Sequence, residues 1–207
     1  MEYIQSCHPM FLYEREIWDD GVSFIAGIDE AGRGPLAGPV VAAAVIIPKE
    51  TKFPLVNDSK KLTDKQRRVL RTEIMSVDEV LFSIVEISVS EIEKINILRA
   101  THLAMKKTVQ KLQCADFALI DGLPVPQFPI PSKAIVKGDS KSASIAAASI
   151  LAKVYRDELM EKYAVKYPQY GFDKNKGYGT SAHMTALKKY GPCPIHRKTF
   201  APVKSLL

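Results

Sequence analysis

The hydrophobic residues of this chain fall into two patterns, short continuous apolar runs and longer stretches with a helical period. Four apolar runs, at residues 24–28, 40–47, 117–120 and 134–136, predict buried strands, and residues 80–89 alternate enough to predict a fifth strand. Glycine and proline crowd the interval between the first two runs. Such residues are typical of turns, so we expect the second strand to pair back on the first.

Helical periods fill most of the remaining chain. They cover residues 63–74, 90–113, 142–166 and 181–190, and Thr63 is a plausible N-cap for the first of these helices. Strands and helices in this order predict an α/β domain with a mixed sheet flanked by helices. No linker long enough to separate two globular units interrupts the pattern, so we expect a single domain over residues 1–207.

Charge is distributed unevenly along the 207 residues, whose formal net charge is +6. Residues 1–130 carry 15 Lys and Arg against 18 Asp and Glu, a net of −3. Residues 131–207 carry 14 against 5, a net of +9. A concentrated positive charge favours a surface that faces a polyanion, although a solvated lysine-rich helix face gives the same composition.

Several classes of protein are excluded by composition. No apolar run approaches the ~20 residues of a membrane span. The first twenty residues contain five acidic side chains, which excludes a signal or transit peptide. The three cysteines lack any C-x-x-C spacing, so a disulfide framework and a zinc knuckle are not expected. We therefore expect a cytoplasmic protein with free thiols and no membrane partner.

Acidic residues follow three of the predicted strands. Asp29, Asp121 and Asp139 each come just after an apolar run, and Glu30 adds a fourth carboxylate. Ligands of open α/β sheets gather at the carboxyl ends of strands, and four converging carboxylates would repel unless cations neutralised them. Hard oxygen ligands select Mg²⁺ or Mn²⁺, and two such ions can promote phosphodiester hydrolysis. Each acid taken alone is equally typical of a turn.

Three further segments contain residues suited to phosphates or nucleic acid. Gly32, Arg33 and Gly34 form a turn that a ligand can approach closely, although a tight hairpin needs the same glycines. The second segment is a loop in which Ser59, Lys60 and Lys61 offer a hydroxyl and two cations to phosphates, although a plain surface turn has the same composition. The third segment places Tyr178 between glycines and among lysines, which suits a nucleic-acid backbone, although such a tyrosine is also typical of a packing anchor. His183 follows Tyr178 closely enough to reach a site.

Seven blocks of sequence, in order, resemble the bacterial ribonuclease HII family. The resemblance spans residues 24–202. The blocks read GIDEAGRGPLAGPV at 27–40, DSKKL at 58–62, IDG at 120–122, KGD at 137–139, AAASILAK at 146–153, KGYGT at 176–180 and HRKTF at 196–200.

The resemblance implies a ribonuclease H-like fold, with residues from about 165 to 207 as a basic, helical, substrate-binding extension. It implies an endonuclease that hydrolyses the RNA strand of RNA–DNA hybrids and incises on the 5′ side of single ribonucleotides in duplex DNA, leaving 3′-hydroxyl and 5′-phosphate ends. Ribonucleotide excision repair and DNA replication are the processes it implies. The sister family, ribonuclease HIII, usually carries an N-terminal substrate-binding domain. About twenty residues precede the first strand here, which favours HII.

The resemblance also assigns roles to residues. Asp29, Glu30, Asp121 and Asp139 would be the catalytic carboxylates and would bind two Mn²⁺ or Mg²⁺ ions. The turn at Gly32, Arg33 and Gly34 would contact the ribose 2′-hydroxyl, which distinguishes RNA from DNA. Tyr178 would stack on the sugar beside the scissile bond, and Ser59, Lys60 and Lys61 would hold phosphates.

The expected partners are an RNA–DNA hybrid and ribonucleotide-containing duplex DNA, bound by a monomer. Residues 204–207 do not read as a peptide that binds a replication clamp. The alternatives are another metal nuclease of the same fold, such as a junction resolvase or an exonuclease, a non-catalytic nucleic-acid-binding module, and a structural or interaction domain.

Overall fold

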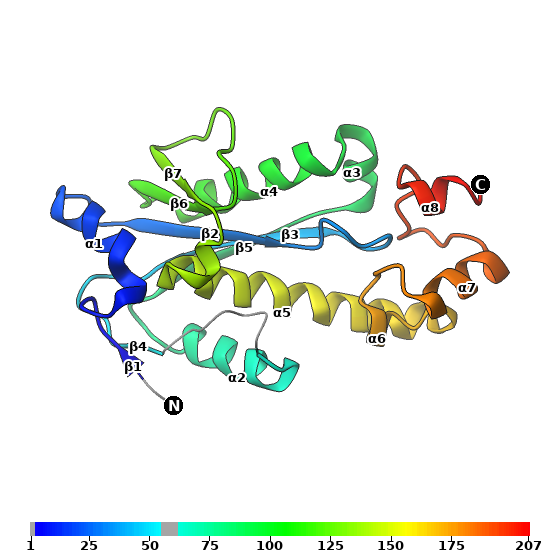
Figure 1. The fold of residues 1–207 in the computed structure, drawn as a ribbon, viewed down its shortest axis with the longest axis horizontal. Coiled ribbons are helices and arrows are strands. Elements are labelled where there is room, and N and C mark those ends of the chain that lie inside the picture. Colours follow the sequence, from blue (N-terminus) through cyan, green and yellow to red (C-terminus); the bar gives the residue numbers. More distant parts are fainter. Residues whose placement is uncertain (1–2, 55–61) are drawn as a thin grey trace.

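A five-stranded mixed sheet lies between two layers of helices in the computed structural model, which describes residues 3–54 and 62–207 (Figure 1). The spatial order is β5-β3-β2-β6-β7. Strand β2 pairs antiparallel with β3 and parallel with β6, which in turn pairs parallel with β7. The strands are β2 (Ile25–Ala31), β3 (Val40–Ile46), β5 (Leu81–Ile87), β6 (Phe117–Asp121) and β7 (Ser132–Ile135). The α/β fold class expected from the sequence is confirmed.

Strand β2 is buried on both faces because a helical layer covers each side of the sheet. Ile25 packs with α5 (Ala143–Lys166), whereas Ala26 and Ile28 pack with α4 (Ile97–Leu112). Helices α1 (Leu12–Asp19) and α2 (Asp64–Met75) lie on the α5 side, and α3 (Val89–Ile95) precedes α4 (Figure 1). A Cβ built at Gly27 would come closer than 3.0 Å to the backbone of Ser144 and Ile145. The missing side chain is therefore what lets α5 approach β2 so closely.

Glu14 of α1 anchors the N-terminal end of α5. Its Oε1 accepts hydrogen bonds from the hydroxyls of Ser142 and Ser144, both at 2.6 Å, and from the Ser144 amide at 3.0 Å. Only 1% of Glu14 is exposed, and burial raises the pKa of this carboxyl. Beside α1 lies a small sheet of β1 (Tyr3–Ile4) and β4 (Phe53–Pro54), two strands that the sequence pattern did not predict.

The single long helix predicted over residues 90–113 is wrong. It is interrupted at Asn96, whose φ of 67° stops α3, and whose side chain accepts a hydrogen bond from the Arg99 amide to cap α4. Strand β2 also continues further than predicted, so that Asp29 and Glu30 lie inside it rather than after it. The Thr63 cap of α2 is confirmed, with Gln66 completing a capping box.

The C-terminal third packs as short helices against one end of α5 and the tip of the β2–β3 hairpin (Figure 1). These helices are η4 (Pro168–Tyr170), α6 (Phe172–Asn175), α7 (Ser181–Tyr190) and α8 (Ala201–Lys204). A further short helix, η3 (Gly138–Ser140), lies before α5. Their apolar cluster joins Leu36 of the hairpin to Met160, Phe172 and Leu187. No helix in the described part of the chain is long and apolar enough to cross a membrane.

Candidate active site

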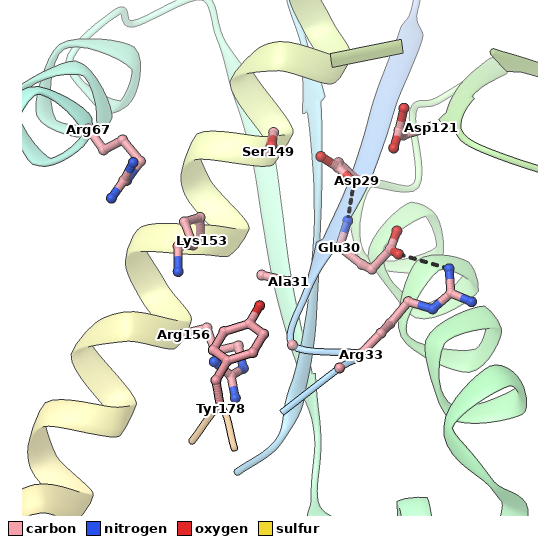
Figure 2. A pocket seen from close by; sticks show the side chains of 12 residues that line it. Asp29, Glu30, Ala31, Arg33, Arg67, Asp121, Ser149, Lys153, Arg156 and Tyr178 are labelled. Carbon is pink, nitrogen blue, oxygen red and sulfur yellow. Dashed lines mark hydrogen bonds and ion pairs between the residues drawn. The ribbon is translucent and has the colours of Figure 1, made fainter. Parts of the chain in front are cut away.

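Two acidic residues stand side by side on neighbouring parallel strands. Ile28 of β2 is in register with Ile120 of β6, which places the next residues, Asp29 and Asp121, at adjacent positions. Together with Glu30 they line one side of a pocket of about 350 Å³. Figure 2 shows these carboxylates facing it from the sheet. The prediction that acids meet at the carboxyl ends of parallel strands holds for this pair.

Asp29 is a strongly perturbed carboxyl of the pocket. It is 6% exposed, and burial raises its pKa well above the ordinary value, with repulsion from Glu30 and Asp121 adding to the effect. Hydrogen bonds from the Ser149 hydroxyl and, at 2.7 Å, from the Glu30 amide act in the opposite direction. Burial also raises the pKa of Glu30, against the attraction of Arg33, whose Nη1 lies 3.2 Å from Oε1. Burial and the repulsion between neighbouring carboxylates thus disfavour the ionised forms of Asp29 and Glu30.

Such a site fits a divalent cation. Its donors are carboxylate oxygens, and a bound cation would relieve both the desolvation and the mutual repulsion of Asp29, Glu30 and Asp121. Within residues 3–54 and 62–207, however, no three His, Cys, Asp or Glu side chains are already close enough to hold a metal ion.

Asp139 lies beside this pocket but does not line it. It is in η3, 2% exposed, and the preceding residue, Gly138, donates its amide to Asp121 Oδ1 at 2.6 Å. The turn at the end of β7 is therefore tied to the end of β6. Its role as a fourth ligand stays a prediction.

The opposite wall of the pocket is basic (Figure 2). It consists of Arg67 from α2 and of Lys153 and Arg156 from α5. Lys153 donates to Asp157 at 2.9 Å, and Ser149 bonds Asp29, so the i, i+4 pair Ser149 and Lys153 is not a nucleophile–base dyad. Sequence reasoning did not place Arg67 or Arg156 at the site, because only the packing of α2 and α5 brings them there.

The predicted glycine turn and Tyr178 share the remaining side of the pocket. Gly32, Arg33 and Gly34 line it, and Gly34 lies beside the Tyr178 ring, whose Cε1 would be 3.7 Å from an added Cβ. Position 32 requires glycine for two reasons: its φ is +98°, and a Cβ would overlap the side chain of Arg156.

Four further residues were singled out in the sequence, and only His183 is among the described residues. Ser59, Lys60 and Lys61 lie outside the described residues. His183 is fully buried under the Tyr178 loop, with Nδ1 2.8 Å from the Tyr178 carbonyl oxygen. The expectation that it reaches a site is wrong, because it supports the loop from within the C-terminal cluster.

Solved structures share this fold. The ribonuclease HII in a complex with PCNA from Archaeoglobus fulgidus is 25% identical, with a TM-score of 0.72 over 88% of this chain and 96% of that one. The ribonuclease H2 of Pyrococcus horikoshii is 27% identical, also with a TM-score of 0.72 and the same coverage. The Bst-RNase HIII structure in complex with Mn²⁺, 19% identical, matches in fold with a TM-score of 0.70, over 96% of this chain and 73% of that one. The fold and its acidic edge define a ribonuclease H-like nuclease.

Sequence comparison narrows that class. The profile of the family described as Ribonuclease HII matches residues 26–203. Ribonuclease HII of Chlamydia caviae is 55% identical over 95% of this chain and 92% of its own, and that of Caldanaerobacter subterraneus is 53% identical over 95% and 82%. The chain belongs to the ribonuclease HII family and is a type 2 ribonuclease H, an enzyme that acts on nucleic acid.

Proposed function

We propose that this enzyme hydrolyses the RNA strand of RNA–DNA hybrids and incises on the 5′ side of single ribonucleotides embedded in duplex DNA. One observation carries the proposal. The acidic pair Asp29 and Asp121 shares a single pocket with the Gly32–Gly34 turn and Tyr178. Groups suited to cleaving a phosphodiester therefore lie next to groups suited to reading a ribose.

The carboxylates of Asp29, Glu30 and Asp121, with Asp139 behind them, would hold two Mn²⁺ or Mg²⁺ ions. The ions would activate water and stabilise the leaving oxygen, giving 3′-hydroxyl and 5′-phosphate ends. The chain's own contribution is orientation. The Ser149 hydroxyl holds Asp29, and the Gly138 amide holds Asp121 at 2.6 Å. These hydrogen bonds favour the ionised carboxylates that a cation requires.

Substrate binding would use the basic side of the molecule. Arg67, Lys153 and the C-terminal region of residues 165–207 supply positive charge toward phosphates, with Ser59, Lys60 and Lys61 added on sequence grounds. Tyr178 is 46% exposed, so its side chain would be accessible for stacking on a sugar. We infer a single domain, a monomer and a cytoplasmic location as part of the same proposal.

The decisive test is cleavage of an end-labelled duplex that bears one ribonucleotide, with Mg²⁺, Mn²⁺ and EDTA run in parallel. We expect one cut on the 5′ side of the ribonucleotide with either metal and none with EDTA. The variant Asp29→Asn should lose cleavage and keep duplex binding, because the basic wall is unchanged. Asp78→Asn, an exposed acid outside both the pocket and residues 165–207, is the matched control and should cleave normally. Robust metal-dependent cleavage by Asp29→Asn would overturn the assignment.

Tyr178 tests the reading of the ribose. Tyr178→Ala should reduce cleavage more on a single embedded ribonucleotide than on a long hybrid, whereas Tyr178→Phe, which keeps the ring, should stay near wild type on both. Equal losses on the two substrates would argue against a role at the RNA–DNA junction. Cleavage that ignores ribonucleotides would favour another metal nuclease, and binding without cleavage would favour a non-catalytic module.

A further inference from the structure

Two buried arginines lie under the glycine turn, and both donate their hydrogen bonds to main-chain carbonyl oxygens. Arg156 is 1% exposed and Arg197 is fully buried. Arg156 donates to the carbonyls of Ala37, Pro39 and Lys176 at 3.0–3.1 Å. Because these partners are neutral, each guanidinium brings a whole positive charge into the interior, and burial lowers the pKa of Arg197 to about 9.

Arg197 holds the turn itself. Its guanidinium donates hydrogen bonds to the carbonyl oxygens of five residues at 2.6–3.2 Å, and its main-chain amide donates to Leu36 O at 2.8 Å. The five are Gly32, Arg33, Pro35, Gly38 and Pro39. A fork of five N–H donors suits such a convergence, and a lysine ammonium with three does not.

This contact determines which way the amides of the turn point. Every peptide bond in the described chain is trans, so the carbonyl of one residue and the N–H of the next point in opposite directions. The carbonyls of Gly32 and Arg33 point inward to Arg197, at 2.6 and 3.0 Å. The N–H groups of Arg33 and Gly34 must therefore point away from it, toward the pocket that these residues line.

The neighbouring residue, His196, supports the Tyr178 loop, which is the second part of the site proposed to recognise the ribose. The Cys193 amide donates to His196 Nδ1 at 2.9 Å, so the neutral ring carries its proton on Nε2. That proton is donated to His183 Nε2 at 3.0 Å, which leaves the His183 proton on Nδ1, donated to the Tyr178 carbonyl at 2.8 Å. Burial lowers the pKa of both rings, that of His196 to about 4, so the neutral chain of bonds persists at physiological pH.

We propose that His196 and Arg197 are positioning residues that hold the Gly32–Gly34 turn and the Tyr178 loop in mutual register, and so determine the preference for a ribonucleotide over a deoxyribonucleotide. The inference rests on the proposed function. Neither residue lines the pocket, so neither is a catalytic residue. Their effect reaches the substrate through the turn amides and the tyrosine ring.

The test measures binding in the Asp29→Asn background, using a duplex with one ribonucleotide and the same duplex with deoxyribose throughout. The readout is the ratio of the two dissociation constants. Arg197→Lys keeps the charge but not the fork, and we expect the ratio to fall about tenfold, the effect of one misaligned hydrogen bond. Affinity for the all-DNA duplex should stay unchanged, because the basic surface is intact.

Arg15→Lys is the matched control. Arg15 also donates to two main-chain carbonyls, those of Ser6 and His8, but far from the pocket, so its variant should keep the wild-type ratio. An unchanged ratio in Arg197→Lys would overturn the inference while leaving the proposed function intact. Absence of any ribonucleotide preference in the Asp29→Asn protein with Arg197 intact would instead refute the proposed function.

A measurement on the parent protein covers the case in which Arg197→Lys does not fold. The side-chain ¹⁵N resonances of Arg197 should shift when the ribonucleotide duplex binds and shift less with the all-DNA duplex. A purely structural arginine would respond equally to the two duplexes, and that result would overturn the inference.

Discussion

Gly27 lies where helix α5 packs directly on strand β2, two residues before Asp29 on the same face of the sheet. A Cβ at this position would meet the Ser144 carbonyl carbon, the Ile145 amide nitrogen and the Ser144 hydroxyl, all inside 3.0 Å. Two of the three atoms are helix backbone, which cannot rotate away as a side chain can. Gly27→Ala must therefore push the whole N-terminal half of α5 off the sheet.

Overpacking of this kind typically costs 1–3 kcal/mol, and the rigid neighbours place Gly27→Ala near the upper end, about 3 kcal/mol. For a domain of this size the melting temperature should fall by about 6–12 °C. Urea and thermal unfolding followed by circular dichroism measure both quantities. Gly34→Ala is the control, because its added Cβ makes only an ordinary 3.7 Å contact with Tyr178.

Gly34→Ala should leave the free energy of unfolding within about 0.5 kcal/mol of wild type, as surface substitutions usually do. A Gly27→Ala protein that melts within 2 °C of the wild type, about 1 kcal/mol or less, would refute the close packing of α5 on β2. Such a result would also remove the reason given for a glycine at this position.

Cation binding should raise thermal stability, because it offsets the burial and the repulsion that together raise the pKa of Asp29. At a hundredfold excess over Kd, Mn²⁺ should add about 2.7 kcal/mol to the unfolding free energy. In a thermal-shift titration, Asp121→Asn should lose most of that gain, and an equal gain in both proteins would contradict the site. Glu14 should make stability depend on pH. Its folded-state pKa is raised above 4.5, so the folded state binds the proton more tightly and the wild type loses stability as pH rises from about 4.5 through that raised value. Urea unfolding of Glu14→Gln should show a smaller loss over the same window, and parallel curves for the two proteins would count against the buried carboxyl.

The sheet and the acidic pair were predictable because they depend on short-range patterns. Apolar runs locate β2 and β6, and the carboxyl ends of parallel strands meet by geometry, which brings Asp29 and Asp121 together. Asn96 was not predictable in this way. A helical period continues through it, and only its positive φ and its cap on Arg99 divide the helix in two.

The residues that hold the turn and the Tyr178 loop in place could not be predicted from the sequence either. Arg197 reads as one more cation of the basic C-terminal third, and His183 reads as a group close to a site. Their actual partners, the turn carbonyls and the Tyr178 carbonyl, are main-chain atoms that leave no mark on the sequence pattern. Ser59, Lys60 and Lys61 remain sequence-based predictions.

The contact between Arg197 and Gly32 joins positions 165 residues apart. Such a contact forms late, because long loops close at an entropic cost and a chain is synthesised from its N-terminus. The acids of β2 emerge early during translation, but the turn beside them gains its guanidinium partner only after Arg197 has been added. We therefore expect a nascent chain that ends before Arg197 to form its sheet without yet distinguishing ribose from deoxyribose. Substrate selection would then be the last property that the enzyme acquires during biosynthesis.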